Sequence, residues 1–105
     1  NGDGVSQDYK AARTWYEKAA ANNYTLAQFN LALMYFEGLG MPKNLEMSYV
    51  WNTIAEYNGN MQASHSRKLD ERTMLPKEVA EAKEKADAIY NKILAGTYAG
   101  EGRMF

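Results

Sequence analysis

The residues most able to do chemistry in this sequence surround its single histidine, His65. Ser64 and Ser66 flank it, an arrangement that would place a hydroxyl nucleophile beside a general base. A catalytic histidine needs a partner that orients it, and no acidic residue stands three or four positions from His65. We therefore expect His65 to be exposed or to line a groove, unless the fold supplies a partner.

The other reactive residues form no catalytic or metal-binding pattern. The chain has 105 residues and no cysteine, which excludes disulfides, thiol catalysis and cysteine-based zinc sites. The pair Asp70–Glu71 and the series Glu78, Glu81 and Glu84 supply carboxylates, but the series alternates with lysines, as on a solvated helix face. We predict no catalytic residue, no metal site and no cofactor.

Charge and hydropathy exclude two further classes of partner. The chain carries 12 basic and 13 acidic residues, so it lacks the positive charge expected of a nucleic-acid-binding domain. No window approaches the roughly 18 consecutive apolar residues of a membrane-spanning helix. We expect one domain that binds no nucleic acid and spans no membrane.

The sequence repeats itself at a spacing of 36 residues. At this offset its only two tryptophans, Trp15 and Trp51, coincide, and so do the glycines of Gly2–Gly4 and Gly38–Gly40. Further identities pair Ala19 with Ala55, Asn22 with Asn58, Ala27 with Ala63 and Leu33 with Leu69. A fixed period of this length is the signature of stacked helical repeats. The glycines then mark turns, and neither pair is followed by the lysine and hydroxyl residue of a phosphate-binding loop.

Each of the two Gly-x-Gly segments is expected to form a turn, followed by a capping residue and a helix. Asp8 and Asn44 are the expected caps, because either side chain can accept a hydrogen bond from the next turn. Hydrophobic spacing and turn residues predict helices over about 9–21, 25–37, 45–57, 61–73 and 76–94. The repeat units run over about 1–24, 25–60 and 61–95, and residues 96–105 are predicted to form a flexible tail.

The helix over 25–37 carries two apolar stripes. Ala27, Leu31, Ala32 and Tyr35 form one stripe, and Phe29, Leu33 and Phe36 form the other. A helix with two apolar faces must be covered on two sides, so we expect an inner helix of the array. The last helix has a charged outer face, which a terminal repeat needs to end a stack. Both tryptophans are expected in the core, where a large ring fills the gap between units.

The sequence opens at a turn, without the helix that the repeat would place before it. The first helix should therefore expose an apolar side. We expect either that the sequence is part of a longer array or that a second copy covers this N-terminal face, which would give symmetric self-association.

The segment Ala27–Gly40, AQFNLALMYFEGLG, resembles the signature of the Sel-like repeat, a family related to the tetratricopeptide repeat. The run Trp15–Ala20 and a weaker copy over 40–55 continue the consensus, and the resemblance is close over about 2–57. It implies an all-α fold, namely a short right-handed α-solenoid of helix-turn-helix repeats with a concave face. It also implies a scaffold or adaptor without catalytic residues. It leaves the compartment open but favours a bacterial, periplasmic or exported protein.

The layout of tetratricopeptide repeats points the second apolar stripe into the concave groove. The predicted partner-binding residues are Phe29, Asn30, Leu33, Phe36 and Glu37, with His65, Leu69 and Arg72 from the next unit. Aromatic side chains with an arginine nearby are typical of binding surfaces. The competing interpretation places Phe29, Leu33 and Phe36 in the core.

We predict from this groove a module that binds a protein, a peptide or a partner helix and catalyses nothing. The alternative function is an enzyme, or a subunit of one, acting on a cell-wall or peptide substrate in the same groove. That alternative requires an inward-facing carboxylate or an acid–histidine pair, for which the sequence offers only His65 and Glu37.

Overall fold

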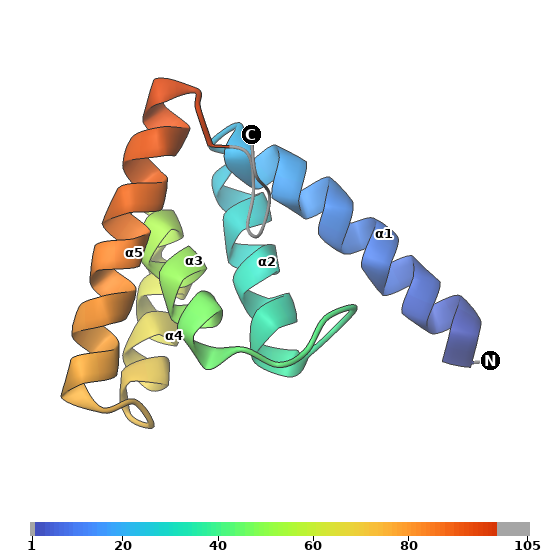
Figure 1. Ribbon diagram of the computed structural model, residues 1–105, viewed down its shortest axis with the longest axis horizontal. Coiled ribbons are helices and arrows are strands. Elements are labelled where there is room, and N and C mark those ends of the chain that lie inside the picture. Colours follow the sequence, from blue (N-terminus) through green and yellow to red (C-terminus); the bar gives the residue numbers. More distant parts are fainter. Residues whose placement is uncertain (1, 99–105) are drawn as a thin grey trace.

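The computed structural model describes residues 2–98, which form five helices and no strand. The helices are α1 (Gly2–Ala21), α2 (Thr25–Glu37), α3 (Leu45–Tyr57), α4 (Met61–Glu71) and α5 (Pro76–Ala95). Figure 1 shows α3, α4 and α5 close together, α2 beside them, and α1 slanting away from the rest. The predicted all-α solenoid of helix pairs is confirmed.

The 36-residue repeat is visible in the backbone hydrogen bonds of the tight turns that join the helices of each pair. The Tyr24 N–H donates to the Ala19 carbonyl at 3.0 Å after α1, and the Asn60 N–H donates to the Ala55 carbonyl at 3.0 Å after α3. These donors and acceptors stand 36 residues apart, so α1–α2 and α3–α4 are joined in the same way.

Helix α1 begins earlier than the sequence predicts. Gly2–Gly4 and the Asp8 cap were expected to precede the helix, yet both lie inside it. In the second unit Pro42 follows the glycine pair and disfavours helical backbone at the residue before it, whereas the equivalent residue in the first unit is Ser6. Glycine inside a helix costs only about 1 kcal/mol, so without a proline the helix continues. The first turn and the Asp8 cap were wrong predictions.

The second Gly-x-Gly does form the predicted turn. Gly40 has a φ of 75°, and a Cβ added to it would stand 2.8 Å from the backbone carbonyl of Tyr9. Only glycine therefore lets this loop approach α1 so closely. Asn44 then caps α3 as predicted, because its side chain accepts a hydrogen bond from the Met47 N–H at 3.1 Å.

The most enclosed helix is α3. Every residue from Met47 to Ala55 is buried, because α2, α4 and α5 all pack against α3. Helix α2 was expected to be the inner helix, and it does lie between α1 and α3. Its remaining side is open, however, and leaves Leu26, Leu33 and Phe36 exposed.

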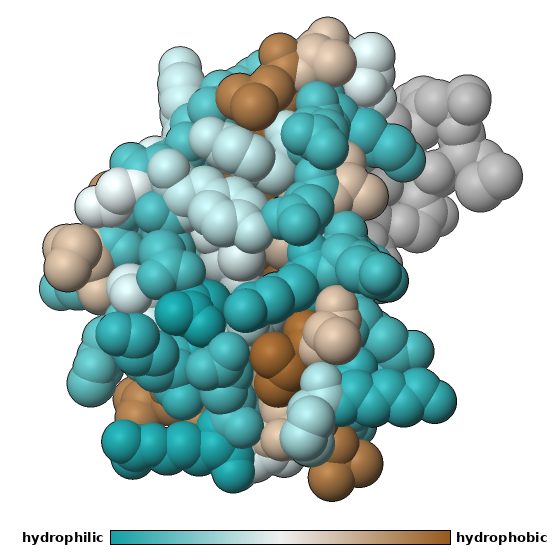
Figure 2. Space-filling model, turned by 90° about the vertical axis from the view of Figure 1, so that its left-hand side faces the viewer, coloured by the Kyte–Doolittle hydropathy of each residue, from teal (hydrophilic) through white to brown (hydrophobic). Residues whose placement is uncertain are grey.

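Helix α5 covers the far side of α3. Its Ala82, Ala86, Ile89 and Ile93 belong to the core, and Gly96 ends it in the left-handed conformation. The side of the molecule on which α5 lies is shown in Figure 2 and is mainly hydrophilic. The charged outer face expected of a terminal helix is present, because its lysines and glutamates are mostly exposed.

The two tryptophans have opposite environments. Trp51 is 1% exposed within the core that α3 forms with α5, and its ring meets Tyr98 edge-on at 5.8 Å. Trp15 is 69% exposed, because α1 has α2 as its only substantial neighbour among the described helices. The core prediction is confirmed for Trp51 and wrong for Trp15. Residues 99–105 of the predicted tail lie outside the described residues, and its flexibility stays a prediction.

Candidate partner-binding groove

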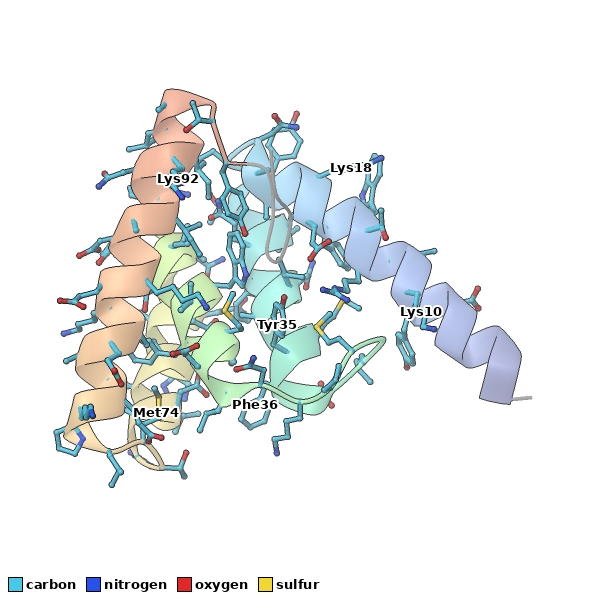
Figure 3. The ribbon with its side chains drawn as sticks, in the orientation of Figure 1. Lys10, Lys18, Tyr35, Phe36, Met74 and Lys92 are labelled. Atoms are coloured by element: carbon cyan, nitrogen blue, oxygen red, sulfur yellow. The ribbon has the colours of Figure 1, made fainter. Side chains whose placement is uncertain are left out.

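A hollow of about 140 Å³ opens between α2 and α4, above α3. It is lined by Phe29, Leu33 and Phe36 of α2, Ser48 and Asn52 of α3, and Ser66, Leu69 and Asp70 of α4. We call this set the α2–α4 groove. Figure 3 shows Phe36 at the end of α2 where the connection to α3 begins. A cavity of roughly 150 Å³ holds a benzene-sized molecule, so the hollow has room for one side chain.

The apolar walls of the groove are open to solvent. Leu33 is 45% exposed, Phe36 43% and Leu69 43%, while Phe29 is half-buried. The interpretation of Leu33 and Phe36 as core residues was therefore wrong. Large apolar side chains gathered around a hollow form a surface that a partner can cover at little cost in desolvation.

The other predicted binding residues do not join this groove. Asn30 lines a different hollow, of about 200 Å³, between α1 and α2. Glu37, His65 and Arg72 are exposed and line neither hollow. A helix turns by about 100° per residue, so His65 points well away from the face that Ser66 presents to the groove.

The two hollows are equivalent under the repeat. Ala12, Tyr16, Asn30, Leu33 and Met34 line the hollow between α1 and α2, and adding 36 to each gives Ser48, Asn52, Ser66, Leu69 and Asp70. The second unit therefore keeps the position of the hollow, while Ser48, Asn52 and Asp70 replace Ala12, Tyr16 and Met34 in its lining.

Asp70 is the most unusual of these replacements. It is 3% exposed and accepts hydrogen bonds from Ser48 Oγ at 2.9 Å and from Asn52 Nδ2 at 3.3 Å. No ion pair to Asp70 occurs in the described part of the chain. Sequence reasoning missed it, because the pair with Glu71 was noted only as a source of carboxylates and was given no position in the fold. The signal was available, because the 36-residue offset places Asp70 on Met34, a buried position of α2.

Burial raises the pKa of Asp70 above its usual value of 3.8, and the hydrogen bonds from Ser48 and Asn52 lower it only in part. The folded chain then binds this proton more tightly than the unfolded chain, so stability falls as the pH rises from about 3.8 through the raised pKa. Above that window the buried carboxylate costs stability.

Asp70→Asn should therefore unfold at a higher urea concentration than the wild type near pH 7, by on the order of 1 kcal/mol in free energy. The new amide also gives Asn52 a possible donor. We expect the advantage of the variant to shrink as the pH falls toward about 4. If the free energy of unfolding of the wild type instead rose relative to that of the variant as the pH rises, the hydrogen bonds to the carboxylate would outweigh its desolvation.

The repeat that carries both hollows matches a known family. The family model of the Sel1 repeat matches residues 1–24 and 25–60. This chain belongs to the Sel1 repeat family. The resemblance to Sel-like repeats is thereby confirmed, and Sel1 repeats are generally protein-interaction scaffold modules, typically without catalysis.

Two further comparisons add nothing to this assignment. Neither the curated proteins nor the solved structures compared with this Sel1 repeat protein gave a match. None of its described helices is long and apolar enough to cross a membrane.

Proposed function

We propose that this Sel1 repeat protein binds a segment of a partner protein in the α2–α4 groove and catalyses no reaction. The observation that carries the proposal is the group of half-exposed apolar side chains, Leu33, Phe36 and Leu69, around one hollow. Their burial by a partner contributes about 25 cal/mol per Å² of apolar surface removed from water. The partner-binding roles of these three residues and of Phe29 are part of the proposal.

The size of the groove favours an inserted side chain with a short flanking segment. The hollow of about 140 Å³ accepts one anchor, and the exposed rings and leucines around it offer the surface on which the rest of the segment would rest. Lys43 adds a charge at the rim, since its ammonium lies 5.2 Å from the centre of the Phe36 ring.

The environment of the reactive side chains supports binding over catalysis. His65 is exposed and lies outside both hollows. Arg67 is held by Glu56 at 2.6 Å and by Glu71 at 3.0 Å, which leaves it little freedom to stabilise a substrate. The described residues contain no group of three side chains that could hold a metal ion.

The proposal is tested by selecting peptides from a displayed random library on the folded protein and mapping the best binder by backbone amide shifts. We expect shifts concentrated on α2 and α4 around the hollow. A footprint confined to the outer side of α5, or the absence of any specific binder, would contradict the proposal.

Self-association through α1 is a second candidate interaction, and the 69% exposure of Trp15 favours it. Light scattering over a dilution series should then show a dimer that Trp15→Ala dissociates. A wild type that stays monomeric at every concentration would remove this candidate.

A further inference from the structure

The floor of the α2–α4 groove carries hydrogen-bond acceptors that the described protein does not satisfy. Both hydrogen bonds to Asp70 end on Oδ2. Oδ1 accepts none from the described residues, and it is not among the fully enclosed polar atoms that lack a partner. Asp70 lines the hollow, so a group seated there is the one placed to reach Oδ1.

Asn52 adds a second unsatisfied acceptor. Its Nδ2 donates to Asp70, while its Oδ1 is enclosed without a hydrogen-bond partner in the described structure. The opposite orientation of the amide would set its oxygen against the carboxylate, so the donor position is fixed by Asp70. A buried acceptor left without a donor is costly, and because this oxygen is enclosed it adds to the negative potential beside Asp70 without itself meeting a ligand.

The equivalent hollow of the first repeat shows that the fold does not require this chemistry. There Met34 stands in place of Asp70, Ala12 in place of Ser48, and Tyr16 in place of Asn52. Of the two hollows, only the second therefore contains the carboxylate and its two hydrogen-bond donors. They give that hollow a negative charge beneath apolar walls.

We propose that the α2–α4 groove takes the side chain of a lysine from the partner protein, with the ammonium at Asp70 and the alkyl stem between the apolar walls. This inference rests on the proposed function. An ammonium brings three donors, one of which can satisfy the open oxygen of Asp70. The apolar walls, which include Phe29 and Phe36, can cover the alkyl stem of the lysine.

The hydrogen bonding of Asp70 selects lysine over arginine. A guanidinium binds a carboxylate best through two parallel hydrogen bonds, one to each oxygen. Here Oδ2 already accepts from Ser48 and Asn52, so only Oδ1 is open. A compact ammonium needs no second oxygen. Lys43 lies over the Phe36 ring at 5.2 Å, and no ion pair joins it to Asp70 in the described structure.

The test is a titration of the folded protein near pH 7 with n-butylammonium chloride, which reproduces the lysine side chain. Its controls are n-butanol, butyrate and n-propylguanidinium. We expect millimolar binding of butylammonium, as suits a ligand of five non-hydrogen atoms, with shifts at the Asn52 side-chain amide and around Ser66. Butanol and propylguanidinium should bind more weakly, and butyrate not at all.

Two variants separate charge from shape. Asp70→Asn keeps the size of the side chain and should weaken butylammonium binding at least about tenfold while leaving butanol unchanged. Asp70→Met copies the first hollow and should abolish the preference for a cation. Amide spectra outside the groove report whether each variant is folded. The inference is overturned if the wild type binds butanol and butylammonium equally, or if folded Asp70→Asn binds butylammonium as tightly as the wild type does.

The lysine inference and the proposed function fail in different ways. Selected peptides that occupy the groove but carry no lysine at the anchor position would overturn the inference and leave the proposed function standing. Butylammonium binding at Asp70, with no peptide bound in the groove, would overturn the proposed function but leave the preference of the hollow for an alkylammonium standing. Peptides that lose at least about tenfold in affinity when the anchor lysine becomes norleucine would support both.

Discussion

Trp51→Ala will lower the free energy of unfolding by about 3–5 kcal/mol, the range for truncating a large buried ring. Trp51 is 1% exposed at the centre of α3, where it joins the core shared with α5. Its indole N–H has no hydrogen-bond partner in the described structure, so the loss arises from packing alone. Urea unfolding followed by circular dichroism measures the effect.

The matched control stands at the same position of the preceding repeat. Trp15 is 69% exposed on α1, and Trp15→Ala should change the free energy of unfolding by less than about 1 kcal/mol. Making the same substitution at two equivalent repeat positions thus separates the effect of burial from the effect of the residue type. Equal losses at the two positions would show that α1 packs against a neighbour as α3 does.

Asn58→Ala should be nearly as damaging, with an expected loss of about 2–3 kcal/mol. The Asn58 amide donates to Asn23 at 2.8 Å and to Gln28 at 3.0 Å, and its oxygen accepts from the Tyr90 hydroxyl at 2.8 Å. This one side chain therefore connects both helix–helix turns with α5. Gln28 is fully buried, so truncation leaves its amide oxygen short of a donor.

Asn22 gives the control for this network. It is the repeat equivalent of Asn58, but it is exposed and its side chain donates only to the Lys18 carbonyl, at 3.2 Å. Asn22→Ala should stay within about 0.5 kcal/mol of the wild type. Chemical unfolding of both variants decides the point, and similar stabilities for the two would refute the role of Asn58 as a link between repeats.

Helix positions followed from the sequence wherever periodicity and turn chemistry agreed. Helices α2 and α3 have the predicted bounds because Asn44, the Gly38–Gly40 turn and the polar turns around Asn22 and Asn58 mark their ends. Helix α1 did not follow, because one proline decides whether a Gly-x-Gly segment turns or continues as helix. That difference, Pro42 against Ser6, outweighs the likeness of the glycines.

Only the apolar walls of the groove could be predicted from the sequence, and its buried carboxylate could not. Phe29, Leu33 and Phe36 could be placed on one face by their helical spacing, and the repeat layout implied by the family resemblance added Leu69. Asp70 could not be found by composition, since acidic residues are usually exposed. Its burial depends on Ser48 and Asn52 from α3, and only the tertiary contact between α3 and α4 brings those donors to it.

The central claim, that a partner segment docks in the α2–α4 groove, is tested most directly by two leucines of one helix. Leu33 lines the groove and is 45% exposed, whereas Leu26 is 66% exposed and lines neither hollow. Because both side chains are exposed, we expect each variant to fold. The measurement is the affinity of the display-selected peptide for Leu33→Asp and for Leu26→Asp. We predict a loss of at least about tenfold for Leu33→Asp and less than about twofold for Leu26→Asp. Unchanged affinity in Leu33→Asp, or an equal loss in both, would contradict the account.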